Sequence, residues 1–510
     1  MSSDAHARSI AAWNLASRIT GFGRVLAIGA VLGKTDLGNT YQSANMVSTV
    51  LFELLVAGTL SASLVPELVR AGPERERQLC RSLVTVIGVA MAVLALVMAL
   101  AASPIMRALT AAVDRPDVRA EEIRLGSTWL RLFAPQLLAY GVAAVASAAL
   151  AAQRRFVAAA AGPLVNNVVV MAAAGFVWLQ TRGDRLAFPL DTEPTLVLGI
   201  GTTLGVVALA AVPAISLGWS WLAPTTRWRS RELARIWRAG VWSSGTFAAF
   251  HVLGLAAVVV SSRVPGGAVA FTTAVAFAAV PHALVVHPIV TSRYPGLVAA
   301  AAEGTQQFTE AGRSLVARLL GFVVPVTGVG AIAAIPAMVV VTFGSLSDVQ
   351  SGVRIGPVLA ILCLGLVGRA LFDSFQRVSY AASDVRSPTW AALVGLGVAV
   401  VVMAAASRMS AQRLVWTTAV GYVAGQIVMG LGCVYASYRR GERLVTRASL
   451  VGAVRSLALV APSGLVLWFG SWNGRADALV AVVGIALVAG IGWHFTQRRG
   501  SPTVAGVVDG

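Results

Sequence analysis

Two arginines inside an apolar stretch are the residues whose type and position most clearly indicate chemistry. Arg18 and Arg24 lie within an apolar run from about residue 10 to residue 32. A helix needs roughly 20 residues to cross a bilayer, and at about 1.5 Å per residue both arginines lie ~12 Å from the nearer end. Arginine at that depth costs at least ~2.5 kcal/mol. Arginine is stable at that depth when it faces a water-filled cavity or an anion. The alternative to such a site is that both side chains snorkel to the headgroups.

A second charged set lies near the middle of a later apolar run. Arg369, Asp373 and Arg377 are spaced four residues apart, which places them on one helix face. Asp373 can pair with either arginine, so an ion-pair stripe without a ligand is the alternative to a binding site. Together with Arg18 and Arg24, this face predicts a positively biased membrane cavity. Such a cavity suits an anionic substrate, and the planar fork of arginine matches phosphate.

The second apolar run, about 40–68, is polar for a membrane helix. We predict that four of its polar residues bind substrate together with the arginines: Asn39, Asn45, Glu53 and Ser61.

Six further residues are predicted to gate the site or to shape turns: Gly21, Gly23, Arg155, Pro163, Asp384 and Pro388. Gly21 and Gly23 are expected to loosen the helix between the two arginines. Arg155 and Asp384 fall in short turns on the side predicted to be cytoplasmic. Their charges there either latch the two halves of the protein or simply cap helices and follow the positive-inside rule.

The composition indicates a polytopic all-α membrane protein. The 510 residues are 57% hydrophobic and 12% charged, with a mean hydropathy of +0.77, whereas soluble proteins are about 25% charged. The net charge of +18 does not indicate nucleic-acid binding. The basic residues are nearly all arginines in short loops between apolar runs, which is the positive-inside pattern.

Fourteen membrane spans are expected. Their approximate ranges are 10–33, 40–68, 82–103, 128–152, 157–180, 194–217, 239–262, 267–292, 314–342, 354–381, 388–406, 413–437, 449–469 and 476–495. The arginine-rich loops all fall on one side when both termini are cytoplasmic, so we expect a multi-pass protein of the cytoplasmic (inner) membrane in that orientation.

An internal repeat divides these spans. Pro66-Glu67-Leu68-Val69-Arg70-Ala71 matches Pro295-Gly296-Leu297-Val298-Ala299-Ala300 at an offset of 229 residues, and the turns at Arg155 and Asp384 have the same offset. The repeat predicts an N-terminal lobe over 1–217 (spans 1–6), a C-terminal lobe over 218–438 (spans 7–12), and two additional spans and a short tail over 439–510. Parallel repeats are typical of transporters that bind substrate between lobes. Chance similarity among Ala/Val-rich helices is the alternative.

The sequence contains no recognisable catalytic or metal motif. It has no phosphate-binding Gly-rich loop and no Gly-x-Ser-x-Gly nucleophile motif, and its three cysteines lack metal-ligand spacing. No two of its five histidines form a metal pair with a carboxylate, and His282 and His287 are expected to be packed or interfacial. We therefore predict a transporter rather than an enzyme, without a cofactor.

Several motifs resemble the MurJ/MviN family of lipid II flippases. They are Ser17-Arg18-x-x-Gly21-Phe22-x-Arg24, Phe52-Glu53-Leu54-Leu55-x-x-Gly58-x-x-Ser61, Arg154-Arg155-Phe156 with Pro163, and Arg377-x-x-Tyr380-x-x-x-Asp384-x-x-x-Pro388. The resemblance implies the multidrug/oligosaccharidyl-lipid/polysaccharide exporter fold. It also implies alternating-access transfer of an undecaprenyl-pyrophosphate-linked peptidoglycan precursor between leaflets, with Arg18 and Arg24 engaging the pyrophosphate. The implied partners are the lipid-linked glycan, membrane lipids and cell-wall synthesis proteins.

Three positions depart from the pattern that the resemblance implies. Asn39 stands where many members have an acid, Phe52 where many have a base, and Ala276 where some have an arginine. The alternatives are therefore a flippase for another polyprenyl-linked oligosaccharide, a cation-coupled drug antiporter, or a non-transporting paralogue that acts as a cell-wall scaffold. The coupling ion stays open.

Overall fold

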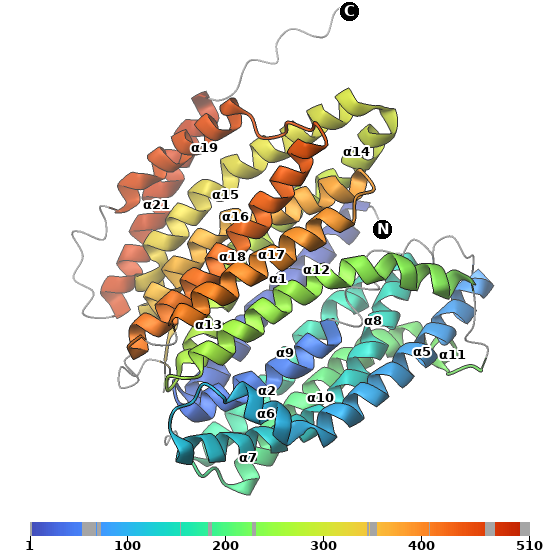
Figure 1. Cartoon of the computed structure of the whole chain (residues 1–510), viewed down its shortest axis with the longest axis vertical. Coiled ribbons are helices and arrows are strands. Elements are labelled where there is room, and N and C mark those ends of the chain that lie inside the picture. The colour runs from blue at the N-terminus through green and yellow to red at the C-terminus, as the bar shows by residue number, and fades with distance from the viewer. Residues whose placement is uncertain are drawn as a thin grey trace, which may run out of the picture. The chain divides into compact units, whose positions relative to one another are not determined.

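The computed structural model describes residues 3–53, 68, 73–153, 155–181, 186–226, 231–343, 346, 354–406, 409–464 and 475–499. Across these residues the chain is helical and contains no strand, which confirms the predicted fold class. The helices, shown in Figure 1, follow in the order α1 (Ser3–Leu32), α2 (Asp36–Phe52), α5 (Pro73–Leu100), α6 (Ala102–Leu109), α7 (Pro116–Phe133), α8 (Gln136–Ala152), α9 (Phe156–Gln180), α10 (Thr192–Leu217), α11 (Trp219–Leu222), α12 (Arg231–Ser261), α13 (Gly267–Pro281), η2 (His282–Val286), α14 (His287–Glu303), α15 (Thr305–Val341), α16 (Ile355–Ala381), α17 (Arg386–Ala406), α18 (Ala411–Arg439), α19 (Arg447–Val460), η4 (Ala461–Gly464) and α21 (Arg475–Arg499).

Ten of the described helical segments are long and apolar enough to cross a membrane. They coincide with the third to twelfth spans expected from the sequence. Helices also cover parts of the other four expected spans, but the described residues of α2 and α19 number only 17 and 14. The chain is thus a multi-pass membrane protein, while the count of fourteen is not confirmed.

The described chain forms two compact units. Unit 1 consists of Met1–Ala276, Phe343–Val353 and Val400–Thr418, and unit 2 consists of Phe277–Thr342, Arg354–Ala399 and Ala419–Gly510. The lobes expected from the repeat, over 1–217 and 218–438, stay a prediction. α12, which the repeat assigns to the C-terminal lobe, packs against α2 in unit 1.

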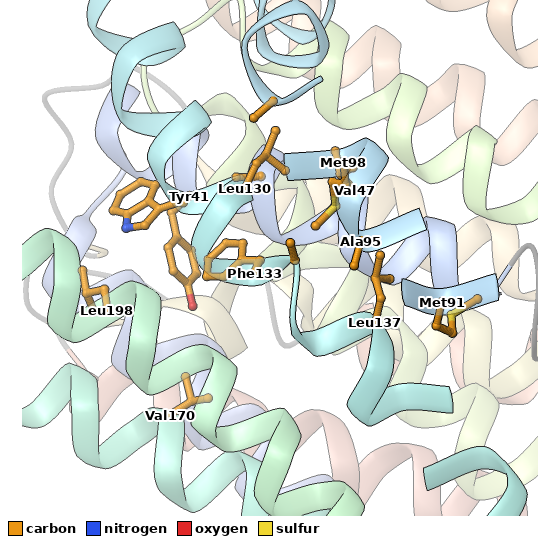
Figure 2. Packing of buried hydrophobic residues seen from close by; sticks show 14 of the residues in the cluster. Tyr41, Val47, Met91, Ala95, Met98, Leu130, Phe133, Leu137, Val170 and Leu198 are labelled. Atoms are coloured by element: carbon orange, nitrogen blue, oxygen red, sulfur yellow. The ribbon is translucent and has the colours of Figure 1, made fainter. Parts of the chain in front are cut away.

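In the core of unit 1, aromatic side chains of α2 and α7 pack against each other (Figure 2). The ring of Tyr41 meets Trp129 and Phe133 edge to face, with centroid distances of 5.4 and 6.0 Å. Its hydroxyl lies 2.7 Å from Oγ1 of Thr202 on α10, so the one polar atom of this buried ring has a partner. Tyr41 thereby holds three helices together.

Unit 2 is held by long helices that approach one another closely at small residues. α15 packs along α16, α19 and α21. On α16, a side chain at Gly368 would place its Cβ only 2.7 Å from the backbone of Ile427 on α18. Small residues permit such backbone contact between membrane helices. This contact positions the charged face of α16 that follows Gly368 in the chain.

Candidate functional site

Arg18 and Arg24, the two arginines of α1 that the sequence singled out, lie in unit 1. The side chain of Arg18 is exposed and that of Arg24 is partly buried. Among the described residues, neither guanidinium has a hydrogen bond or an ion pair. Because an unpaired cation is unfavourable in a membrane span, these two groups require a ligand or water.

The helix that carries these arginines runs through both glycines. α1 is continuous from Ser3 to Leu32, and Gly21 and Gly23 lie inside it. A Cβ at Gly23 would lie 2.8 Å from Sδ of Met171 on α9. On the same side, Asn167 of α9 donates to the Ser17 carbonyl over 3.0 Å. These contacts fix the rotation of α1 about its own axis and hence where the arginines point.

A polar side chain from another helix of unit 1 interacts electrostatically with Arg24. Arg24 and Glu53 both act electrostatically on Tyr140 of α8. The ring of Tyr140 stacks on Phe52 with centroids 4.7 Å apart. Glu53, the residue that follows α2, lies 4.0 Å from Nε2 of His251 on α12. The sequence indicated Arg24 and Glu53, whereas Tyr140 and His251 carried no signal of their own.

The remaining predicted residues of the second span differ in their surroundings. Asn39 is fully buried, and its Nδ2 donates to the carbonyls of Ser262 and Val264 while its Oδ1 accepts from the Ala268 backbone N–H. All of these partners belong to the turn between α12 and α13, so the amide caps α13 rather than facing a ligand. The side chain of Asn45 is half-buried, and Ser61 lies outside the described residues.

The α16 set lies in unit 2. Arg369 and Asp373 form the predicted ion pair, with Nε 3.3 Å from Oδ1. Arg377 does not share this carboxylate, and its guanidinium carbon lies 5.1 Å from the centre of the Tyr294 ring on α14. The second partner of Asp373 is His282, whose Nε2 lies 2.6 Å from Oδ2. His282 was expected to be packed or interfacial, and its side chain is 19% exposed, but the sequence did not indicate its carboxylate partner.

The predicted turn residues occupy helix ends. Arg155 precedes α9 and donates to the carbonyl of Ser216 at the end of α10 over 2.7 Å, and Pro163 lies inside α9. Pro388 lies in the first turn of α17, where its missing N–H is tolerated.

Asp384 caps the N-terminus of α17. Its Oδ1 accepts from the backbone N–H groups of Arg386 and Ser387 over 3.2 and 3.0 Å. Its Oδ2 lies 2.6 Å from Arg440 at the end of α18. Partial burial acts to raise the pKa of the Asp384 carboxyl, but the Ser387 hydrogen bonds, the Arg440 charge and the Arg386 N–H outweigh it and lower the pKa.

A family model described as "Lipid II flippase MurJ" matches residues 28–481 of this chain. The chain belongs to the MurJ family. The match covers most of the chain, including α2, the α12–α13 turn and the charged face of α16.

Known relatives agree with this assignment. A probable lipid II flippase MurJ from Synechocystis sp. (strain ATCC 27184 / PCC 6803 / Kazusa) is 23% identical over 402 residues, or 74% of this chain and 71% of that protein. A solved lipid II flippase MurJ in an inward closed conformation aligns with a TM-score of 0.75, 14% identity and coverage of 96% and 99% of the two chains. An inward-facing MATE family transporter of the MOP superfamily aligns with a TM-score of 0.65, 15% identity and coverage of 83% and 94%. The fold is therefore that of the MOP superfamily transporters.

Proposed function

We propose that this MurJ family member is a flippase that moves lipid II, the undecaprenyl-pyrophosphate-linked peptidoglycan precursor, from the inner to the outer leaflet of the cytoplasmic membrane. Family membership supplies the substrate class, and the motif around Arg18 and Arg24 falls at the site that the resemblance assigns to the pyrophosphate.

The observation that carries the proposal is the state of these two arginines. Both guanidiniums are without a hydrogen bond or ion pair among the described residues, although they lie deep in an apolar helix. A pyrophosphate offers several anionic oxygens and can satisfy both forks through bidentate hydrogen bonds. Hydrogen bonds from the arginine N–H groups would replace the water molecules that the pyrophosphate loses when it enters the membrane.

The proposed binding set also includes residues around these arginines and residues of unit 2. Glu53 and Asn45 offer hydrogen-bonding groups for the polar part of the substrate, and Arg369, Asp373 and Arg377 supply charge from unit 2. Asn39 is left out of this set because its amide is used within the fold. We propose that both termini are cytoplasmic, and that transport follows alternating access as in repeat-built transporters.

Depletion of the protein in its own host tests the proposal. Leaflet-resolved labelling of lipid II should show accumulation in the inner leaflet, and wild-type protein but not Arg24→Ala should restore the distribution. Arg131→Ala is a matched control, because Arg131 is an exposed arginine of α7 in the same unit. An unchanged lipid II distribution on depletion would contradict the proposal and would favour another polyprenyl-linked glycan or a scaffold role.

A further inference from the structure

A histidine–carboxylate pair lies inside unit 2, away from the arginines of α1 in the chain. Nε2 of His282 and Oδ2 of Asp373 are 2.6 Å apart, and the side chains are only 19% and 22% exposed. A carboxylate can only accept hydrogen bonds, so Nε2 carries the hydrogen and Nδ1 of the neutral ring is available for a second proton. Histidine is the side chain that ordinarily changes charge between pH 5 and 8.

The pair occurs where a membrane helix changes its geometry. α13 ends at Pro281, and His282 is the first residue of the π-helical segment His282–Val286 before α14 begins. Proline removes a backbone hydrogen bond, and π-helical segments inside α-helices are frequently found at functional sites. The His282–Asp373 bond therefore ties the irregular segment to the regular helix α16.

The charges around the pair favour a proton over a metal cation. Arg369 lies 3.3 Å from the other oxygen of Asp373, in the position where a cation would bind. Two residues of α18 interact electrostatically with this cluster: Tyr422 with Arg369, and the buried thiol of Cys433 with Asp373. α15 also packs against η2, and among the described residues it contributes no charged group to the pair.

We propose that His282 and Asp373 form a proton-binding site whose occupancy controls the attachment of the π-helical segment His282–Val286 to α16. With neutral His282, the three groups Arg369, Asp373 and His282 have a net charge of zero. Uptake of one proton at Nδ1 converts the imidazole to imidazolium and raises that charge to +1. A net charge within the membrane is unfavourable unless a counter-charge is present.

The added positive charge couples proton uptake to binding of an anionic substrate. This coupling rests on the proposed flippase function. Arg377 lies four residues after Asp373 on the same face of α16, so a pyrophosphate bound at this face compensates the extra positive charge. Linkage is reciprocal: substrate then promotes proton uptake, and lower pH strengthens substrate binding. One linked proton changes the affinity by at most about tenfold per pH unit.

Unit 1 contains a related pair. Glu53 lies 229 positions before His282, the offset of the internal repeat, and its backbone is likewise π-helical. Its carboxylate lies 4.0 Å from His251. The longer distance indicates a weaker interaction, so the proposal concerns the pair in unit 2.

NMR of the full-length protein labelled at histidine Cε1 tests the proton site directly. The chain has five histidines, and His282→Gln identifies the signal of His282. We expect this signal to report proton uptake at Nδ1 when wild-type protein is taken from pH 8 to pH 5, and Asp373→Asn to alter that response. A His282 signal that does not change across this range would overturn the proposal, whether or not the variants transport substrate.

Binding of a short-chain lipid II analogue, measured by tryptophan fluorescence in detergent, tests the link to substrate. Wild type should bind the analogue several-fold more tightly at pH 6 than at pH 8, and His282→Gln should lose this dependence. His287→Gln is the matched control because His287 is exposed at the start of α14, directly after this segment. Binding that is independent of pH in wild type would contradict the link, whereas absence of any binding or flipping by wild type would contradict the proposed function instead.

Discussion

The candidate-site arginines of the two units have different partners. In unit 1, Arg18 and Arg24 have no hydrogen bond or ion pair among the described residues. In unit 2, Arg369 is paired with Asp373, which also binds His282, and Arg377 lies over the ring of Tyr294. Of the arginines singled out from the sequence, Arg369 therefore has a counter-charge within the fold, whereas Arg18 and Arg24 have none among the described residues.

This difference separates two roles within one membrane protein. A cation without a counter-charge is suited to bind an anion that arrives and leaves. A cation that already has a carboxylate contributes less to such binding, but its cluster can change charge by one proton. The comparison predicts that substitutions of Arg18 and Arg24 affect transport most strongly. Substitutions of Arg369 and Asp373 should affect stability and pH dependence as well.

Arg24→Ala is expected to have the largest effect. Loss of a charge-assisted bidentate contact is worth roughly 3 kcal/mol, which corresponds to about 100-fold in the rate of lipid II flipping. Arg24→Lys should retain part of the activity because it keeps the charge without the planar fork. Normal flipping by Arg24→Ala protein that inserts and accumulates would remove the distinction between the two units.

Asp373→Asn is expected to lower stability by about 2 kcal/mol, because it leaves Arg369 without its counter-charge inside the membrane. Thermal unfolding in detergent measures this loss. The double variant Asp373→Asn with Arg369→Gln should recover most of this stability, because both charges of the pair are then removed together. Additive losses in the double variant would show that the pair is not coupled as the structure indicates.

Asn39→Ala tests whether this amide acts within the fold or on substrate. It removes three buried hydrogen bonds to the α12–α13 turn, so we expect a loss of roughly 1–3 kcal/mol in thermal unfolding experiments. Asn39→Asp keeps the acceptor for the Ala268 N–H but directs a carboxylate oxygen at the carbonyls of Ser262 and Val264, so its loss should be at least as large. Unchanged stability together with loss of transport would instead place Asn39 in the binding site.

The smallest predicted effect concerns pH at the α16–α17 turn. The pKa of Asp384 is lowered in the folded state, so the stability that it contributes is fully present above its unfolded pKa and is lost as the pH falls through the folded value. Unfolding midpoints measured between about pH 2 and pH 5 should fall more steeply for wild type than for Asp384→Asn. Parallel curves would show that Arg440 and the α17 N-terminus do not stabilise this carboxylate.

Local sequence patterns predicted much of the fold. Long apolar runs located the third to twelfth spans, because a membrane helix must be apolar over a fixed length. Two features could not be predicted because they involve contacts distant in sequence. Gly23 lies against Met171 from α9, and α12 packs on α2 within unit 1.

The candidate site was predicted in part. The four-residue spacing of Arg369, Asp373 and Arg377 identified one helix face, but it could not show that His282, 91 residues away, binds Asp373. One available signal was that His282 occupies the repeat position of Glu53. The position of Asn39 in a polar span similarly gave no indication that its amide caps another helix.

Flipping by purified protein in liposomes tests the central claim most directly, namely that Arg18 and Arg24, which have no ion pair among the described residues, bind the anionic part of the substrate. Fluorescent lipid II and a membrane-impermeant quencher report the labelled fraction in each leaflet over time. We predict rapid equilibration for wild type and for Arg131→Ala, and little above the rate of empty liposomes for Arg18→Ala and Arg24→Ala. Equal rates for wild type and both α1 variants would contradict the account.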